Sequence, residues 1–176
     1  MSISTYSFLG VSIITSICVM SNSYIVECSN LVGMKCLIDL CFEKKKDMIL
    51  HHVLVVALVH YLNQHNKSEY IKEMTTLLLS TECSTIFYML NDLLKNSVVK
   101  KVNKMAFIST FYYYRIYSYS YFLLYRNVNV AILIHSRNNF EYYEIYFGIY
   151  GLYLLNLYWG TLILKKCITL INKNDS

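Results

Sequence analysis

Six long apolar stretches, separated by short polar segments, are the feature that most constrains how this chain of 176 residues can fold. A helix needs about 20 mostly apolar residues to cross the hydrocarbon core of a bilayer. Stretches of about this length cover residues 4–20, 22–42, 47–64, 70–93, 105–125 and 142–164. They do not alternate between apolar and polar residues as the strands of a membrane barrel do. The sequence therefore predicts an all-α fold, a multi-pass transmembrane helical bundle of about six spans.

The composition also indicates a membrane environment. Hydrophobic residues make up 56% of the chain and charged residues only 15%, whereas soluble domains are usually about 25% charged. The net charge of +5 does not predict nucleic-acid binding, because the basic residues lie in short groups between the apolar stretches rather than along one continuous face. Six cysteines show neither a CxxC pair nor zinc-ligand spacing, so we expect no metal site and no disulfide.

The basic residues predict the orientation of the six spans. Ten of them fall on one side of the membrane and four on the other. Because the cytosolic side carries the excess of Lys and Arg, the first side and both termini are predicted to be cytosolic. The first side carries Lys44, Lys45, Lys46, Lys95, Lys100, Lys101, Lys104, Lys165, Lys166 and Lys173, and the second carries Lys67, Lys72, Arg126 and Arg137.

Three regions are expected along the chain. Residues 1–20 form an N-terminal transmembrane helix, residues 20–166 the main transmembrane domain, and residues 167–176 a short polar cytosolic tail. Residues 11–20 could alternatively be the core of a cleaved signal peptide, since small residues follow them at 21–23. No basic side chain precedes this core, although a signal peptide normally has one. A signal-anchor-like first helix is therefore preferred.

Two histidines within the third span are candidate catalytic residues, because an ionisable group inside a span indicates a functional site. Asp47 and His51 are four residues apart and share a helix face, so the carboxylate is placed to orient the imidazole. His51 and His52 are adjacent and point about 100° apart on a helix, which suits them poorly to chelate one metal. The alternative is that they only hydrogen-bond a neighbouring helix.

Four further polar residues within spans are candidates for lipid binding or for support of the site. Glu82 lies beside Ser84, and Arg115 lies midway along a tyrosine-rich span. Arg115 either neutralises Glu82, in a buried ion pair that fixes helix register, or presents a cation to a lipid phosphate. Asn156 and Trp159 belong to the last span. As alternatives to a role in the site, Asn156 could form an interhelical hydrogen bond and Trp159 could be an aromatic anchor at the membrane interface.

Taken in order, these elements resemble the TLC domain, named for TRAM, Lag and CLN proteins. The resemblance covers residues 20–166. The sequence departs from both branches of the family. Ile86 stands where a Pro commonly follows Ser-Thr in the non-ceramide-synthase branch, and residues 80–85 do not match the His-Asp-x-x-Asp run of ceramide synthases. The second departure indicates a small member of the non-ceramide-synthase type. The matching elements are residues 21–24 (Ser-x-x-Tyr), Asp39, His51-His52, residues 82–87 (Glu-x-Ser-Thr-x-Phe), Arg115-Ile116 and residues 155–159 (Leu-Asn-x-Tyr-Trp).

The resemblance implies three alternative functions. The first is binding or handling of lipid or acyl chains in membrane lipid homeostasis. The second is an acyltransferase of ceramide-synthase type that uses His51 or His52, with acyl-CoA as co-substrate and no other cofactor. The third is a non-enzymatic structural or translocation-associated role.

The expected partners are membrane lipids, and a homo-oligomer or another membrane protein is a further candidate. The resemblance implies an endoplasmic-reticulum-type or host membrane. The many Tyr, Asn, Lys and Ile residues and the absence of Pro are typical of an AT-rich genome, such as that of a giant virus.

Overall fold

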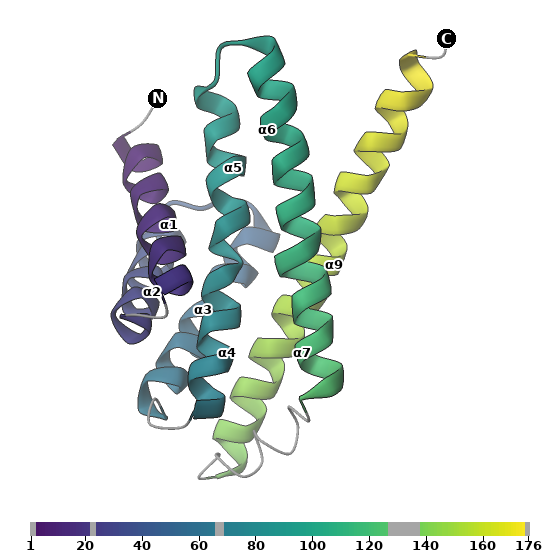
Figure 1. The fold of residues 1–176 in the computed structure, drawn as a ribbon. Helices are drawn as coiled ribbons and strands as arrows, with labels where there is room; N and C mark the ends of the chain where they lie inside the picture. The colour runs from purple at the N-terminus through teal and green to yellow at the C-terminus, as the bar shows by residue number, and fades with distance from the viewer. Residues whose placement is uncertain (1–2, 22–23, 66–68, 127–137, 175–176) are drawn as a thin grey trace.

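A computed structural model describes residues 3–21, 24–65, 69–126 and 138–174, and within these ranges every regular element is a helix (Figure 1). The predicted all-α fold is confirmed. In chain order the elements are α1 (Ile3–Ser21), α2 (Ile25–Leu40), α3 (Lys46–Gln64), α4 (Glu69–Ser80), α5 (Glu82–Leu93), α6 (Ser97–Thr110), the π-helix η1 (Phe111–Ser118), α7 (Tyr119–Tyr125) and α9 (Asn139–Asn174).

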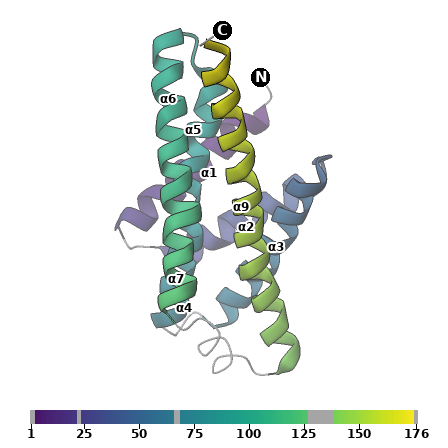
Figure 2. The same cartoon turned by 90° about the vertical axis from the view of Figure 1, so that its right-hand side faces the viewer.

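The helices form a bundle in which α3 contacts both α2 and α9, and α1 contacts both α2 and α5. Helices α5 and α6 run side by side and are joined by a short turn, as Figure 1 shows. Figure 2 shows α9 beside the column made by α6, η1 and α7, and η1 contacts α9 directly. Segments from both halves of the chain therefore surround one interior.

The predicted spans agree with the helices to different degrees. Helices α1 and α3 match the stretches 4–20 and 47–64 to within one residue at each end. Helix α2 has only 16 residues, or about 24 Å at 1.5 Å per residue. Helix α6 begins eight residues before the predicted fifth span, and α9 continues through most of the expected polar tail to Asn174.

The predicted fourth span is interrupted at Thr81, which separates α4 from α5. The hydroxyl of Ser80 donates to the Leu77 carbonyl at 2.6 Å, and that of Thr81 donates to the Leu78 carbonyl at 2.7 Å. Such side-chain bonds to carbonyls three or four residues back compete with the helical backbone bonds and bend helices. The run of hydroxyl residues therefore gives a physical reason for the break.

Helices α6, η1 and α7 follow one another without a break from Ser97 to Tyr125. The Asn96 side chain begins this column by accepting hydrogen bonds from the backbone N–H groups of Val98 and Val99. Within η1, Ser118 donates to the Tyr113 carbonyl five residues back. A π-helical turn is rare and occurs frequently at functional sites. Here it carries the buried Arg115.

Close approach of α3 and α9 depends on two glycines. A Cβ atom at Gly148 would lie 2.7 Å from Cγ of Leu58, and one at Gly151 would lie 2.9 Å from Cδ1 of Leu54. Small residues let helix backbones approach in membrane bundles. The main core forms around this contact and consists of Leu58, Tyr61, Leu62, Ile71, Met74, Tyr119, Phe122, Ile145, Ile149 and Leu152.

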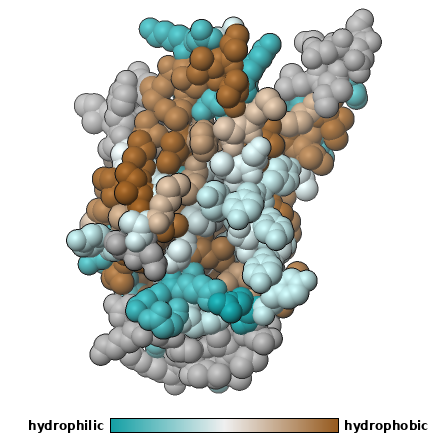
Figure 3. Space-filling view, viewed as in Figure 1, coloured by the Kyte–Doolittle hydropathy of each residue, from teal (hydrophilic) through white to brown (hydrophobic). Residues whose placement is uncertain are grey.

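One helix in the described residues is long and apolar enough to cross a membrane, the part of α9 from Asn139 to Thr169. A shorter apolar stretch covers Leu9–Ser21 in α1. Large apolar side chains such as Phe147 and Leu154 lie on the outer surface of α9, and Figure 3 shows apolar side chains over much of one face of the molecule. Beside its apolar core, the interior also holds buried polar and charged side chains, among them His52, Glu82 and Arg115.

Candidate functional site

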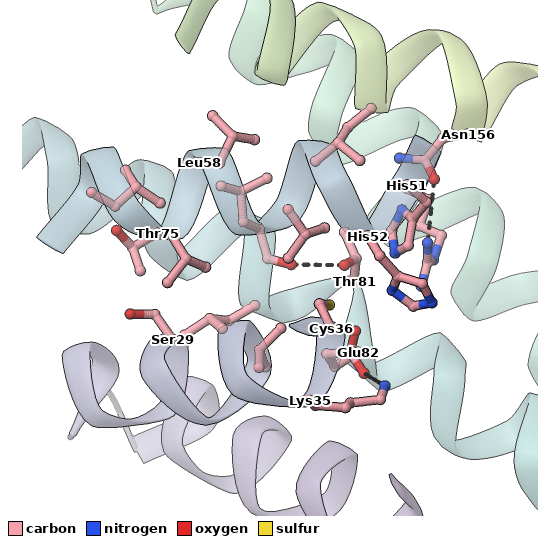
Figure 4. Close-up of a pocket in the computed structure, with 18 of the residues that line it drawn as sticks. Ser29, Lys35, Cys36, His51, His52, Leu58, Thr75, Thr81, Glu82 and Asn156 are labelled. Atoms are coloured by element: carbon pink, nitrogen blue, oxygen red, sulfur yellow. Dashed lines mark hydrogen bonds and ion pairs between the residues drawn. The ribbon is translucent and has the colours of Figure 1, made fainter. Parts of the chain in front are cut away.

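A cavity of about 50 Å³ lies inside the bundle, between α2, α3, α4, α5, η1 and α9. Figure 4 shows its two ends, with His51, His52 and Asn156 at one and Leu58, Thr75 and Ser29 at the other. Its polar end is lined by Lys35, His51, His52, Glu82, Arg115 and Asn156, and its apolar arm by Val55, Leu58, Val59, Leu62, Leu78 and Leu79.

The Glu82 carboxylate, at the first residue of α5, is buried between three helices. It accepts a hydrogen bond of 2.8 Å from the Ser12 hydroxyl of α1 and lies 3.7 Å from Nζ of Lys35 on α2 (Figure 4). Removing one member of a buried ion pair is costly because it leaves an uncompensated charge. Glu82 therefore ties α1 and α2 to α5. Its ion-pair partner is Lys35 and not Arg115, which was one of the alternatives from the sequence.

The Arg115 guanidinium binds three neutral oxygens. Nε donates to the Ser84 hydroxyl at 2.8 Å, and the two terminal nitrogens donate to Thr85 at 3.0 Å and to the Asn156 amide oxygen at 3.3 Å. Its Cζ also lies 5.6 Å above the Phe111 ring. Among the described residues no carboxylate lies within ion-pair distance of Arg115, although the side chain is buried. A guanidinium has five N–H donors, so donors remain for a ligand in the cavity.

The two histidines have different neighbours. Nε2 of His52 lies 3.6 Å from the Asp39 carboxylate of α2, and the His51 ring meets the Trp159 ring edge-on at 5.3 Å between centroids. The Nδ1 atoms of both histidines are buried and have no hydrogen-bond partner. Buried polar atoms are nearly always paired. The two unpaired nitrogens therefore indicate a place where a ligand or water completes the site.

The expected pairing of Asp47 with His51 is not present. Oδ2 of Asp47 instead accepts a hydrogen bond of 2.8 Å from the indole N–H of Trp159 on α9. A carboxylate does lie beside the neighbouring His52, but it is Asp39 of α2. Trp159 thus holds the beginning of α3 against α9 through Asp47. Its ring also contacts that of His51, which lines the cavity.

The structure brings together most of the residues that the sequence marked. His51, His52, Glu82, Arg115 and Asn156 all line the cavity, whereas Asp47 and Trp159 are not among its lining residues. Ser12, Lys35 and Asp39 were not predicted as site residues from the sequence. Lys35 and Asp39 carried a usable signal, because both are charged residues within a predicted span. Ser12 carried none.

The polar end of the cavity combines two cations, Lys35 and Arg115, with the Glu82 carboxylate. Asp39 is not one of the lining residues, but it lies 3.6 Å from the cavity-lining His52. No group of three or more His, Cys, Asp or Glu side chains in the described ranges is arranged to hold a metal ion. A small number of placed polar groups beside an apolar wall is the usual design of a site for an amphipathic ligand. The geometry suits a molecule with a polar group at one end and a hydrocarbon chain at the other.

Comparison with known proteins gives one finding. A family model described as the TLC domain matches residues 16–165, which is most of the chain and close to the expected range of 20–166. No curated protein and no solved structure matches the sequence. The matched range includes the cavity residues on α2, α3, α5, η1 and α9. The chain therefore belongs to the TLC domain family, a family of membrane proteins with lipid-related functions.

Proposed function

We propose that this protein spans the membrane six times and holds the acyl chain of a lipid in its central cavity, with the polar end of the lipid at Lys35, His52 and Arg115. The observation that carries the proposal is the continuity of a charged end and an apolar arm within one cavity. An ordinary buried ion pair that only fixed helix register would not need an apolar arm beside it. Unused donors on Arg115 and unpaired histidine nitrogens supply the polar contacts.

The size of the cavity requires the bundle to adjust when a lipid enters. A single water needs about 10–15 Å³ by the same measure, so about 50 Å³ has room for a few waters. A long acyl chain needs more space. The interruption at Thr81 gives α4 a place to move relative to α5, and Leu78 and Leu79 would move with it because they line the apolar arm.

Substitutions on α3 test this binding with a matched control. Val55 lines the apolar arm, whereas Val53 lies two residues away on the outer surface and is 48% exposed. Val55→Phe fills the arm, and we expect the purified variant to lose lipid that the parent protein retains in native mass spectrometry. Val53→Phe adds the same bulk outside the cavity and should retain the lipid. Equal retention by both variants would contradict the proposal.

The six-span topology, with both termini in the cytosol, rests on the lysine distribution. Insertion of a glycosylation acceptor loop measures it directly. We expect glycosylation of an insertion within residues 127–137 and none for an insertion within residues 95–104. Glycosylation of an insertion within residues 95–104 would contradict the predicted orientation or the six-span model. An endoplasmic-reticulum-type membrane is part of the same proposal, and modification by the glycosylation machinery of that membrane would support it.

A second candidate function, acyl transfer, is favoured by the surroundings of His52. An imidazole that directs its Nε2–H at the Asp39 carboxylate keeps a lone pair on Nδ1, and this atom is unpaired. The lone pair could remove the proton from an amine as the amine attacks an acyl thioester. The carbon–sulfur bond then breaks, an amide forms, and the thiol leaves with the proton.

Acyl-CoA-dependent N-acylation in microsomes tests this second function. His52→Ala should abolish turnover, and Asp39→Asn should lower it. His60→Ala serves as the control, because His60 lies on the same helix but is exposed and contacts Gln64. Activity that survives His51→Ala and His52→Ala would exclude the histidine mechanism. A protein that neither retains lipid nor turns over acyl-CoA would leave the structural or translocation-associated role.

A further inference from the structure

A second concave site lies on the other side of α4 from the cavity. This groove has a volume of about 1050 Å³ and lies between α4, η1, α7 and the beginning of α2. Thr76, Leu77 and Ser80 of α4 line the groove, whereas its residues Leu78 and Leu79 line the cavity. In Figure 3, strongly hydrophilic side chains gather at the lower end of α4 and α7, and paler side chains lie above them over η1 and α7. The groove and the cavity are therefore separate sites.

A column of tyrosines forms one wall of the groove. Tyr113, Tyr117 and Tyr121 follow at intervals of four residues, are 56%, 62% and 53% exposed, and all line the groove. The rings of Tyr113 and Tyr117 stack with centroids 5.8 Å apart. Within the described part of the chain, no residue forms a hydrogen bond with these three hydroxyls. The wall therefore presents unpaired phenol groups outward.

The tyrosine column extends further from the expected membrane interface than tyrosines usually do in membrane proteins. Tyrosines normally gather at the membrane interface, but Tyr113 lies 13 residues before Arg126, or about 20 Å along a helix. A hydroxyl exposed to hydrocarbon without a partner is unfavourable. A polar group that enters the groove would satisfy these hydroxyls. The column therefore suits the head group of a lipid better than its acyl chains.

The lower end of the groove carries charges of both signs. Arg126 forms a two-pronged contact with Glu73 at 2.6 and 2.7 Å, and Lys72 pairs with Glu69 at 2.6 Å. Glu27 adds a third carboxylate, so this end has one more negative group than positive. Guanidinium and ammonium groups bind phosphate, while aromatic rings together with carboxylates suit a quaternary ammonium. The groove therefore places side chains that can bind a phosphate next to side chains that can bind a quaternary ammonium group.

We propose that this groove binds the phosphocholine head group of a bilayer phospholipid. The phosphate binds near Arg126 and Lys72, the choline lies against Tyr117 and Tyr121 with a glutamate beside it, and the acyl chains remain in the bilayer along the outside of η1 and α7. In the topology predicted from the lysines, this end of the groove faces the non-cytosolic leaflet. The groove is a lipid site that is separate from the cavity and does not require the cavity to bind an acyl chain.

Native mass spectrometry of the full chain tests the proposal, with dioleoyl phosphatidylcholine and dioleoylglycerol as the two probes. They share their acyl chains, and only the first has a head group. We expect phosphatidylcholine to bind about tenfold more tightly or better. Equal binding of the two probes would overturn the proposal, because it would show that only hydrocarbon is recognised.

Variants of the tyrosine column locate the binding. Tyr117→Leu combined with Tyr121→Leu should reduce this preference by about tenfold. Tyr143→Leu is the control, because Tyr143 is similarly exposed at 55% but lies on α9 outside the groove. An equal effect of the control would refute the site. Phosphatidylcholine binding that survives the two tyrosine substitutions but is abolished by Val55→Phe would place the lipid in the cavity, which would refute the groove site while supporting the cavity.

Discussion

The contact between Gly148 and Leu58 allows a quantitative test of how closely α3 and α9 pack. In Gly148→Ala, the new Cβ atom would lie 2.7 Å from Cγ and 2.8 Å from Cδ2 of Leu58. Leu58 is only 1% exposed, so it has little space into which it can move. Overpacking of a well-packed core costs about 1–3 kcal/mol. Replacing a helical glycine by alanine recovers about 0.8–1 kcal/mol, which leaves a net loss of up to about 2 kcal/mol.

Gly160→Ala is the matched control on the same helix. Its new Cβ atom would meet Cδ1 of Ile116 at 3.6 Å, which is ordinary van der Waals contact. Only the gain in helix propensity remains, so this variant should be more stable than the parent by up to about 1 kcal/mol. The two variants should therefore differ by about 1–3 kcal/mol in their free energies of unfolding.

Thermal unfolding in one detergent measures this difference, since 1 kcal/mol shifts the melting temperature of a chain of this size by about 2–4 °C. A double-mutant cycle then identifies the contact. Leu58→Ala alone should cost about 2–5 kcal/mol, and less in the Gly148→Ala background because the shortened side chain removes the overlap. Equal stability of the two alanine variants, together with an additive cycle, would refute the close packing.

Three further predictions concern charged residues. Lys35→Met should cost about 3–5 kcal/mol, because it leaves the Glu82 carboxylate buried without its cation, whereas Lys35→Met with Glu82→Met should recover most of this loss in the same unfolding assay. Arg115→Lys keeps the charge but cannot reach Ser84, Thr85 and Asn156 together, so it should lower stability by about 1–3 kcal/mol. The backbone N–H groups of Lys45 and Lys44 hold the pKa of Glu43 below its ordinary value of 4.5. Since the pKa is lowered by folding, the stabilisation is present above pH 4.5 and is lost as the pH falls through the folded-state pKa. Glu43→Gln should therefore reduce the acid sensitivity of the melting temperature below pH 4.5, and an unchanged profile would contradict this.

The helices were predictable where hydrophobicity alone determines them. The apolar stretches located α1 and α3 to within one residue, because a helix that is apolar on all sides needs only length and composition. The interruption at Thr81 was not predicted, since hydropathy does not register hydroxyls that bond to their own helix, as those of Ser80 and Thr81 do. The π-helical segment also left no periodic signal in its run of aromatic residues.

The members of the site were more predictable than their pairings. Because an ionisable group is costly to bury in a membrane span, His51, His52, Glu82 and Arg115 were predicted as site residues. All four line the cavity. Helical spacing suggested Asp47 as the partner of His51, but the indole of Trp159 binds that carboxylate instead. The two residues are 112 positions apart. The spacing of residues within one helix cannot predict that tertiary packing brings a side chain from another helix to bind the same carboxylate.

Trp159 also has a practical consequence. It is the single tryptophan of the chain, and it is held between the Asp47 carboxylate and the ring of His51, a cavity-lining residue. Excitation at the long-wavelength edge of the protein absorption, where the 18 tyrosines barely absorb, therefore selects the emission of one indole that contacts a cavity-lining residue. Titration with a candidate ligand can thus be followed by emission wavelength and intensity, with no dye attached.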